Sequence, residues 1–254
     1  MSLFNSYMKD GPGVSKNEKK KKRFFVFFDI YIKRFWKLII INLLYFACCI
    51  PVVTIGPATA GLTVVLRNYG RDTHSFVPSD FFDGIKKNWK QALAVSFIYL
   101  FVYVSLAFAI PFWYGKAAEN AFFYLPFFLC IFIAIEALFA SYYIFPMIVT
   151  FDMKLKQIIK NSVIFASIGL KTNIITTIIL ALIIIPFFIG SIIVPPLLFL
   201  IPFILLSTVG LIVNFNVYPY LKKYIIDPYY KEHPEEIEDL SSTEAIFNDE
   251  EALQ

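Results

Sequence analysis

The sequence predicts an all-α fold: a polytopic transmembrane helix bundle with about six spans, one of them short. Of the 254 residues, 58% are hydrophobic and only 17% are charged, and mean hydropathy is +0.67. Soluble globular chains carry roughly 25% charged residues, and one soluble core could not bury so much apolar surface. The apolar residues also form long runs without the period-two alternation of a membrane β-barrel. Helices are the expected element because they satisfy their own backbone groups inside lipid.

Five apolar runs are long enough to cross a bilayer, since a hydrocarbon core of about 30 Å needs roughly 20 helical residues. They are residues 35–53, 91–113, 121–149, 172–194 and 197–217. A sixth run, residues 57–66, is short and ends at Arg67. We expect residues 35–69 to form a helical hairpin whose second arm is short, tilted or partly inserted.

The candidate turn of this hairpin contains Thr54, Gly56, Pro57 and Thr59. A proline lacks the N–H donor and disfavours helix before it, so Pro51 and Pro57 bracket a tight reversal. Thr54 is placed to cap a helix that begins at Pro57. The start of that helix is also a place where an anion or a carbonyl group could bind, although capping alone explains the threonines.

The distribution of Lys and Arg predicts the orientation. With six crossings and both termini inside, the cytoplasmic segments are residues 1–37, 67–90, 150–171 and 218–254. They hold 22 of the 23 basic residues, and only Lys116 lies outside them. Cytoplasmic loops concentrate Lys and Arg. We therefore expect a multi-pass membrane protein with both termini in the cytoplasm.

Charge also divides the chain into three parts: a basic cytoplasmic N-terminal segment (1–34), a transmembrane domain (35–222) and an acidic cytoplasmic tail (223–254). Beside a membrane span, a basic run is more typical of topology and anionic headgroups than of nucleic acid. We expect no nucleic-acid partner. The tail either docks on a basic partner surface or only keeps the protein soluble.

The transmembrane domain contains a predicted internal repeat, with units at approximately 79–149 and 152–222. Each unit begins with a basic amphipathic segment, followed by a Lys-Asn pair, and ends with an aromatic-Pro pair 58 residues after the Asn. Two helices of this kind would lie in the headgroup plane. Their candidate interfacial or partner contacts are Phe82, Lys86, Asn88, Trp89, Lys156, Lys160 and Asn161. Unless the spacing is coincidental, the two units are parallel copies.

Two polar residues form the candidate intramembrane site, Glu136 and Asn42. Glu136 is the one formal charge in the middle of a predicted span, and such a group costs a few kcal/mol on insertion scales. It either binds a proton, a cation or a polar solute, pairs across a subunit contact, or is a protonated Glu bonded to Tyr, Asn or Ser. Asn42 is more typical of a hydrogen bond between helices than of a ligand site.

No reaction is recognisable in the sequence. It contains no Gly-rich phosphate loop, no nucleophile elbow and no His-Glu-x-x-His pattern. Cys48, Cys49 and Cys130 lie in apolar runs, and the two histidines are far apart, so neither a disulfide framework nor a zinc site is expected. We expect no catalysis, no cofactor and no metal.

Several motifs carry a family resemblance. They include Ile50-Pro-Val-Val-Thr-Ile-Gly-Pro-Ala-Thr-Ala60, Phe81-Phe82-x-Gly84-x-Lys86-x-Asn88, Tyr143-x-Phe145-Pro146 and Leu155-Lys156-Gln157-x-x-Lys160-Asn161. Over roughly residues 24–222 the chain resembles the YesL family of bacterial membrane proteins, whose function is unknown. Members are often encoded beside carbohydrate ABC importer components and glycan-degrading enzymes. The resemblance implies no catalytic residues.

The leading hypothesis is therefore an accessory membrane protein associated with a carbohydrate ABC importer, either a permease-binding subunit or a modulator of sugar uptake. Its partners would be the lipid bilayer and the permease subunits, and any small-molecule substrate is unknown. The alternative is a small secondary transporter or channel with Glu136 in the path. Against it, the position equivalent to Glu136 in the second unit is the apolar Val209. A third, weaker hypothesis is a membrane sensor that signals through the acidic tail.

Overall fold

The computed structural model describes residues 22–71, 73 and 75–232. In this part of the chain the secondary structure is helical throughout, without a β-strand. The α-helices are α1 (Arg23–Lys33), α2 (Phe35–Cys48), α3 (Ile55–Gly70), α4 (Val77–Ala117), α5 (Tyr124–Thr150), α6 (Leu155–Ile168), α7 (Leu170–Ile193), α8 (Leu206–Leu221) and α9 (Asp227–Glu232). Short 3-10 or π-helical segments join some of them: η1 (Val52–Thr54), η2 (Ala121–Phe123), η3 (Pro195–Leu200), η4 (Ile201–Leu205) and η5 (Lys222–Ile226).

The protein is an all-α membrane helix bundle, as the sequence predicts. Four helical stretches are long and apolar enough to cross a membrane: Val77–Glu119, Ala121–Thr150, Leu170–Ile193 and Pro195–Glu232. The first predicted span, residues 35–53, is shorter than expected, because α2 has 14 residues and ends at Cys48. Ile50 precedes Pro51, and a residue before proline is pushed out of the helical region. The count of six crossings remains a prediction.

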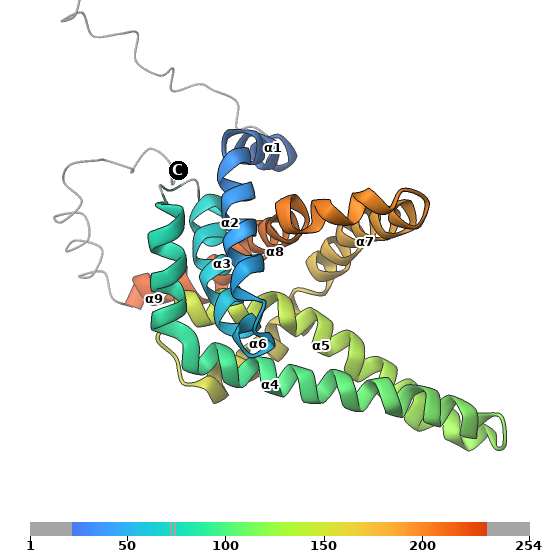
Figure 1. Cartoon of the computed structure of the whole chain (residues 1–254). Helices are drawn as coiled ribbons and strands as arrows, with labels where there is room; N and C mark the ends of the chain where they lie inside the picture. Colours follow the sequence, from blue (N-terminus) through green and yellow to red (C-terminus); the bar gives the residue numbers. More distant parts are fainter. Residues whose placement is uncertain (1–21, 72, 74, 233–254) are drawn as a thin grey trace, which may run out of the picture.

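Two helical hairpins diverge from a common junction (Figure 1). One arm consists of α4 and α5, and the other of α7 and α8. Large apolar side chains such as Phe101, Phe108 and Leu182 are exposed along the arms, where they face lipid. The α2–α3 hairpin stands beside the junction, with α1 at its end. The basic residues 1–21 and most of the predicted tail, residues 233–254, lie outside the described residues.

Helix α3 is the centre of the junction. Ten of its 16 residues are buried, and it packs against α2, α4, α5 and α8. Its closest partner is α4, which it meets through glycines: a Cβ built on Gly84 would lie 3.1 Å from the Cα of Gly61. Small residues let two helix backbones approach closely. The predicted short arm of the hairpin is therefore the most buried helix of the bundle.

Helix α4 differs from the prediction in one respect. The segment predicted as a separate interfacial helix, residues 79–90, is the first part of one continuous helix of 41 residues. Such a helix is about 60 Å long, twice a hydrocarbon core of about 30 Å. Its charged first part must therefore extend beyond the hydrocarbon, and Figure 1 shows this part beside α3.

The second predicted unit is built differently at the same point, because α6 and α7 are separated at Gly169. A Cβ built on Gly169 would lie 2.1 Å from the hydroxyl of Tyr143. That hydroxyl donates to Asn173 Oδ1 at 2.8 Å, and Asn173 Nδ2 donates to the carbonyl oxygen of Ala166 at 2.8 Å. A buried polar network thus stabilises the break. In the first unit the equivalent position is Ser96, inside the uninterrupted α4.

Candidate functional site

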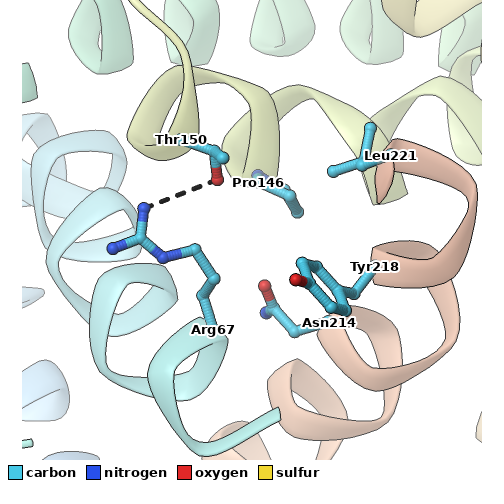
Figure 2. Close-up of a pocket in the computed structure, with 6 residues that line it drawn as sticks. All are labelled: Arg67, Pro146, Thr150, Asn214, Tyr218 and Leu221. Carbon is cyan, nitrogen blue, oxygen red and sulfur yellow. Dashed lines mark hydrogen bonds between the residues drawn. The ribbon is translucent and has the colours of Figure 1, made fainter. Parts of the chain in front are cut away.

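A small cavity lies at the junction, where the ends of α3, α5 and α8 meet (Figure 2). It is lined by Arg67 from α3, Pro146 and Thr150 from α5, and Asn214, Tyr218 and Leu221 from α8. Its volume of about 10 Å³ is close to the minimum that holds one water molecule. Figure 2 shows the side-chain oxygens of Asn214 and Tyr218 turned toward this space.

Arg67 is the main polar group of the cavity wall. Its Nη1 donates to the carbonyl oxygen of Val149 at 2.6 Å and lies 3.5 Å from Oγ1 of Thr150, while Nε and Nη2 donate to Asn68 Oδ1. Arg67 therefore caps the carbonyl end of α5, where a cation is favourable. Within the described chain no carboxylate forms a salt bridge with it. Burial and, to a smaller extent, the nearby Arg71 cation lower the pKa of Arg67 to about 10, against the opposing effect of Tyr218 and Asp80. The guanidinium therefore stays charged at neutral pH.

Arg71 follows one helical turn after Arg67. Its guanidinium carbon lies 4.6 Å from the ring centroid of Tyr218, a distance typical of a cation–π contact. Its Nε is buried and has no hydrogen-bond partner. Asn214, only 6% exposed, uses its Nδ2 to donate to the carbonyl oxygen of Gly210 at 2.8 Å. Arg67 and Arg71 thus both lie near Tyr218, and the carboxylate of Asp80 offsets part of the charge of Arg67.

A larger, apolar groove lies on the outer side of the α2–α3 hairpin. It has a volume of about 320 Å³, within the lower range of ligand pockets. The hairpin contributes Ala47, Cys48, Pro51, Thr54, Pro57 and Ala58, and α4 contributes Phe82 and Ile85. The structure therefore brings the predicted turn next to Phe82, one of the predicted contact residues.

The threonines of the predicted turn form hydrogen bonds within their own hairpin. Thr54 was expected to cap α3, but its hydroxyl donates back to the carbonyl oxygens of Cys48 and Pro51, and α3 has no side-chain cap. That expectation is wrong, because the η1 turn leaves the end of α2 as the nearer acceptor. Thr59 donates to the carbonyl oxygen of Ile55 at 2.7 Å and also bonds the Tyr45 hydroxyl at 3.1 Å. Gly56 and Pro57 are buried at the start of α3.

Asn42 joins α2 to the start of the second arm. It is fully buried, its Nδ2 donates to the carbonyl oxygen of Ile201 at 2.9 Å, and its Oδ1 accepts from the backbone N–H of Ser207 at 2.8 Å. These backbone groups flank the π-helical η4, where the regular helical ladder is interrupted. Asn42 therefore replaces hydrogen bonds that the π-helical turn leaves open.

Glu136 lies apart from Asn42, on the face of α5 that meets the end of α6. It is half-buried, and its Oε1 accepts from the hydroxyl of Ser167 at 3.3 Å. It lines neither the junction cavity nor the apolar groove. The two residues of the candidate intramembrane site are therefore not parts of one site in this structure.

The predicted contacts of α4 divide between two faces. Phe82, Lys86 and Trp89 are exposed on the outer face, and Lys90 Nζ lies 5.6 Å from the Trp89 ring. Asn88 points inward, is 9% exposed and donates to the carbonyl oxygen of Gly84 at 2.9 Å. Asn88 is therefore not a surface contact, because its side chain is occupied inside the bundle.

On α6, the predicted contacts Lys156 and Lys160 are exposed, whereas Asn161 is half-buried and lies 3.6 Å from the sulfur of Met153. Gln91 Nε2 of α4 donates to the carbonyl oxygen of Met153 at 2.9 Å. This bond connects the two basic segments, α4 and the start of α6, which are far apart in the sequence.

Arg67 and Arg71 count in the sequence only as markers of orientation, whereas in the structure they join the end of α3 to α5 and α8. Their spacing of four residues is visible in the sequence and predicts a common helical face. Tyr218 and Thr150, however, come from α8 and α5, and a single sequence does not show that they meet α3.

Among the described residues, no cluster of three or more His, Cys, Asp or Glu side chains could hold a metal ion.

Residues 38–110 match a family described as "Protein of unknown function, DUF624". The matched stretch runs from Leu38 in α2 through α3 to Ile110 in α4. It contains every residue that lines the apolar groove, and also Arg67 and Arg71. Comparison with curated proteins and with solved structures finds no match.

Proposed function

We propose that the protein is an accessory subunit of a carbohydrate ABC importer in a bacterial cell membrane, and that it binds the permease subunits without catalysis of its own. We also propose that the chain is a member of the YesL family and that both of its termini lie in the cytoplasm. The association with sugar uptake rests on the resemblance to that family. The observation that carries the binding role is the apolar groove, which lies wholly within the stretch that matches the DUF624 family.

The groove has the character of a helix-binding surface in lipid. Its floor consists of small or ring-shaped residues such as Ala47, Ala58 and Pro57, which let another backbone approach closely. Ile50 and Val52, the neighbours in sequence of the lining residue Pro51, are 77% and 73% exposed. The groove lies beside the first part of α4, where the bundle leaves the hydrocarbon, and an apolar concave surface there is covered by lipid or by another apolar helix. We assign it to a transmembrane helix of the permease.

The first part of α4 supports a second contact next to the groove. There Phe82 and Trp89 are exposed beside Lys86, Lys87 and Lys90. Basic residues next to spans favour the cytoplasmic side, which is where an importer couples its permease to its ATPase. Aromatic side chains are also enriched at protein interfaces. The same part of α4 would thus contact the permease both through the groove and through its basic surface.

Photo-crosslinking in cells tests this proposal. A photoreactive amino acid replaces Phe82 in the groove or, as a matched control, Phe108, an equally aromatic and more exposed position on the lipid-facing arm of α4. We expect the Phe82 position to crosslink a permease subunit when cells are grown on the inducing sugar, and the Phe108 position to crosslink lipid. Crosslinks from both positions to the same random set of membrane proteins would refute the proposal.

The alternative, a small transporter or channel with Glu136 in its path, has one favourable observation. Glu136 has a polar partner, Ser167, where the end of α6 meets α5. A midplane site between two repeats would place polar groups in both, whereas Val209 stands at the equivalent position of the second unit. Solute flux into vesicles that contain the purified protein alone would favour this alternative over the accessory role.

A further inference from the structure

We infer that residues 233–254, the acidic end of the chain, dock on a basic surface of the same chain. This basic surface consists of exposed lysines on the first part of α4 and on α6 with its N-cap: Lys86, Lys87, Lys90, Lys154, Lys156 and Lys160. The docking itself does not depend on the proposed association with a permease.

The lysines belong to one surface because α4 and α6 meet. Gln91 Nε2 of α4 donates to the carbonyl oxygen of Met153 at 2.9 Å. The neighbours of these two bonded residues in the sequence are Lys90 and Lys154, and both are exposed. Two segments that are far apart in the sequence thus place their lysines on adjoining parts of the outer face.

The charge of the basic surface is the first argument for its occupant. None of the six lysines forms a salt bridge within the described chain. The acids of the same segments are Asp80, Asp83 and Asp152, so six lysines against three carboxylates leave a net charge of +3. Residues 233–254 contain eight Asp or Glu and no Lys or Arg. Complementary charge of this kind favours association and sets its orientation.

The second argument is the apolar component that the two partners share. Phe82 and Trp89 are 43% and 47% exposed among the lysines of α4. The acidic end carries Ile237, Ile246 and Phe247 among its acids. Exposed ion pairs contribute little each, whereas burial of large apolar side chains contributes more. The basic surface therefore fits an acidic peptide with apolar side chains, which is the composition of residues 233–254.

The third argument is the point of attachment. Tyr224 of η5 packs edge-on against Phe165 of α6, with 6.1 Å between the ring centroids, and α9 ends at Glu232. From Tyr224 to Glu232 the chain advances about 12 Å, and Lys160 lies about 8 Å along α6 from Phe165. Ten further residues in extended conformation span about 33 Å. The acids from Glu244 onward can therefore reach the lysines.

Attachment also favours this occupant over a free one. Figure 1 shows α9 on the side of the molecule away from the two arms, and the first part of α4 lies on that side too. A tethered ligand acts at an effective concentration on the order of mM when its linker spans the distance. A separate acidic protein would have to exceed that concentration to displace it.

Docking has a regulatory consequence, which, unlike the docking itself, rests on the proposed function. The acidic end would cover the exposed faces of Phe82 and Trp89, which the proposed function assigns to the permease. The two then compete, and deletion of residues 233–254 should increase crosslinking of the permease from the Phe82 position.

Photo-crosslinking within the purified full-length protein tests the docking. A photoreactive analogue replaces Phe247 in nanodiscs that contain phosphatidylglycerol, and mass spectrometry identifies the crosslinked peptides. We expect crosslinks to the first part of α4 and to α6 in the monomeric product. Their yield should fall about threefold or more from about 0.1 M to about 1 M salt, as the Debye length falls from about 10 Å to about 3 Å.

Two other products would overturn the inference. Crosslinks to lipid alone would assign the lysines to anionic headgroups. A crosslinked dimer would assign the acidic end to a second copy of the chain. Since the purified protein contains no permease, failure of the proposed function in cells would leave the yield of this experiment unchanged.

Two triple variants with the same net charge distinguish a specific surface from general attraction. The first removes charge from the basic surface: Lys86→Gln, Lys87→Gln and Lys90→Gln. The control removes charge elsewhere: Lys33→Gln, Lys37→Gln and Lys116→Gln. We expect the total crosslink yield to fall about threefold or more in the first variant, because three exposed ion pairs are lost, and to change little in the control. Equal yields from the two variants would refute docking at this surface.

Discussion

Helices α3 and α4 approach each other closely at Gly61, and Gly61→Ala perturbs this contact with a single methyl group. A Cβ at this position would lie 2.5 Å from the carbonyl oxygen of Phe81 and 2.9 Å from Ile85 Cγ1. Carbon atoms are at optimal separation at about 3.5–4.0 Å. The nearest obstacle is a backbone atom, which cannot rotate away, so the two helices must move apart.

The magnitude follows from two opposing effects. Overpacking of a close-packed interior costs about 1–3 kcal/mol. Replacing a helical glycine by alanine contributes up to about 1 kcal/mol in the opposite direction through backbone entropy. Gly115→Ala isolates the second effect, since Gly115 also lies in a helix and a Cβ there meets nothing within 4 Å. The difference between the two variants therefore measures the packing cost alone.

The assay is thermal unfolding of both purified variants in the same detergent, followed by tryptophan fluorescence. We expect Gly115→Ala to be as stable as the wild type or slightly more so, and Gly61→Ala to be less stable than Gly115→Ala by about 1–3 kcal/mol. Crosslinking between α3 and α4 should also weaken in Gly61→Ala. Equal stability of the two variants would refute the close approach of α3 and α4.

Three further changes test single contacts. Asn42→Ala leaves the backbone groups of Ile201 and Ser207 buried without partners, so unfolding in detergent should show a loss of about 1–3 kcal/mol per group; an unchanged melting temperature would contradict the bridge. Gly169→Ala should destabilise the protein because its Cβ would meet the Tyr143 hydroxyl, and Tyr143→Phe in the same chain should restore part of the loss. Glu136→Gln should leave sugar uptake in cells unchanged if the protein is an accessory subunit, whereas abolished uptake would favour the transporter.

The sequence predicted well what depends on long runs of residues. Helical class, the two long hairpins and the turn near Gly56 all follow from apolar length and from proline chemistry. It predicted poorly where helices end within polar or mixed segments. The pattern of lysines and aromatic residues in the first part of α4 predicted a separate amphipathic helix. The sequence from Trp89 to Gln91, however, contains no residue that breaks a helix, and α4 continues through it. Amphipathic character alone does not distinguish a surface helix from the extension of a span.

Asn88 illustrates a second limit. The Lys-Asn pair marks the predicted repeat, and the sequence places both residues in a polar segment. In the structure Lys87 is exposed and Asn88 is buried against its own helix, because the face that meets α3 is defined by Phe81, Gly84 and Asn88. That face becomes visible only when α3 is known to pack there. The position of Arg71 near Tyr218 depends in the same way on a contact between distant segments.

The buried polar groups share one physical role, which explains how a mostly apolar bundle adopts a single arrangement. Between apolar helices in lipid the hydrophobic effect provides little preference for one partner over another, so small residues and hydrogen bonds must define the contacts. Gly61 and Gly84 set the distance between α3 and α4. Asn42 fixes α2 at an irregular turn of the second arm, and Tyr143 fixes the break at Gly169. Arg71 contributes in the same way, because its guanidinium lies over the ring of Tyr218 and so joins the end of α3 to α8.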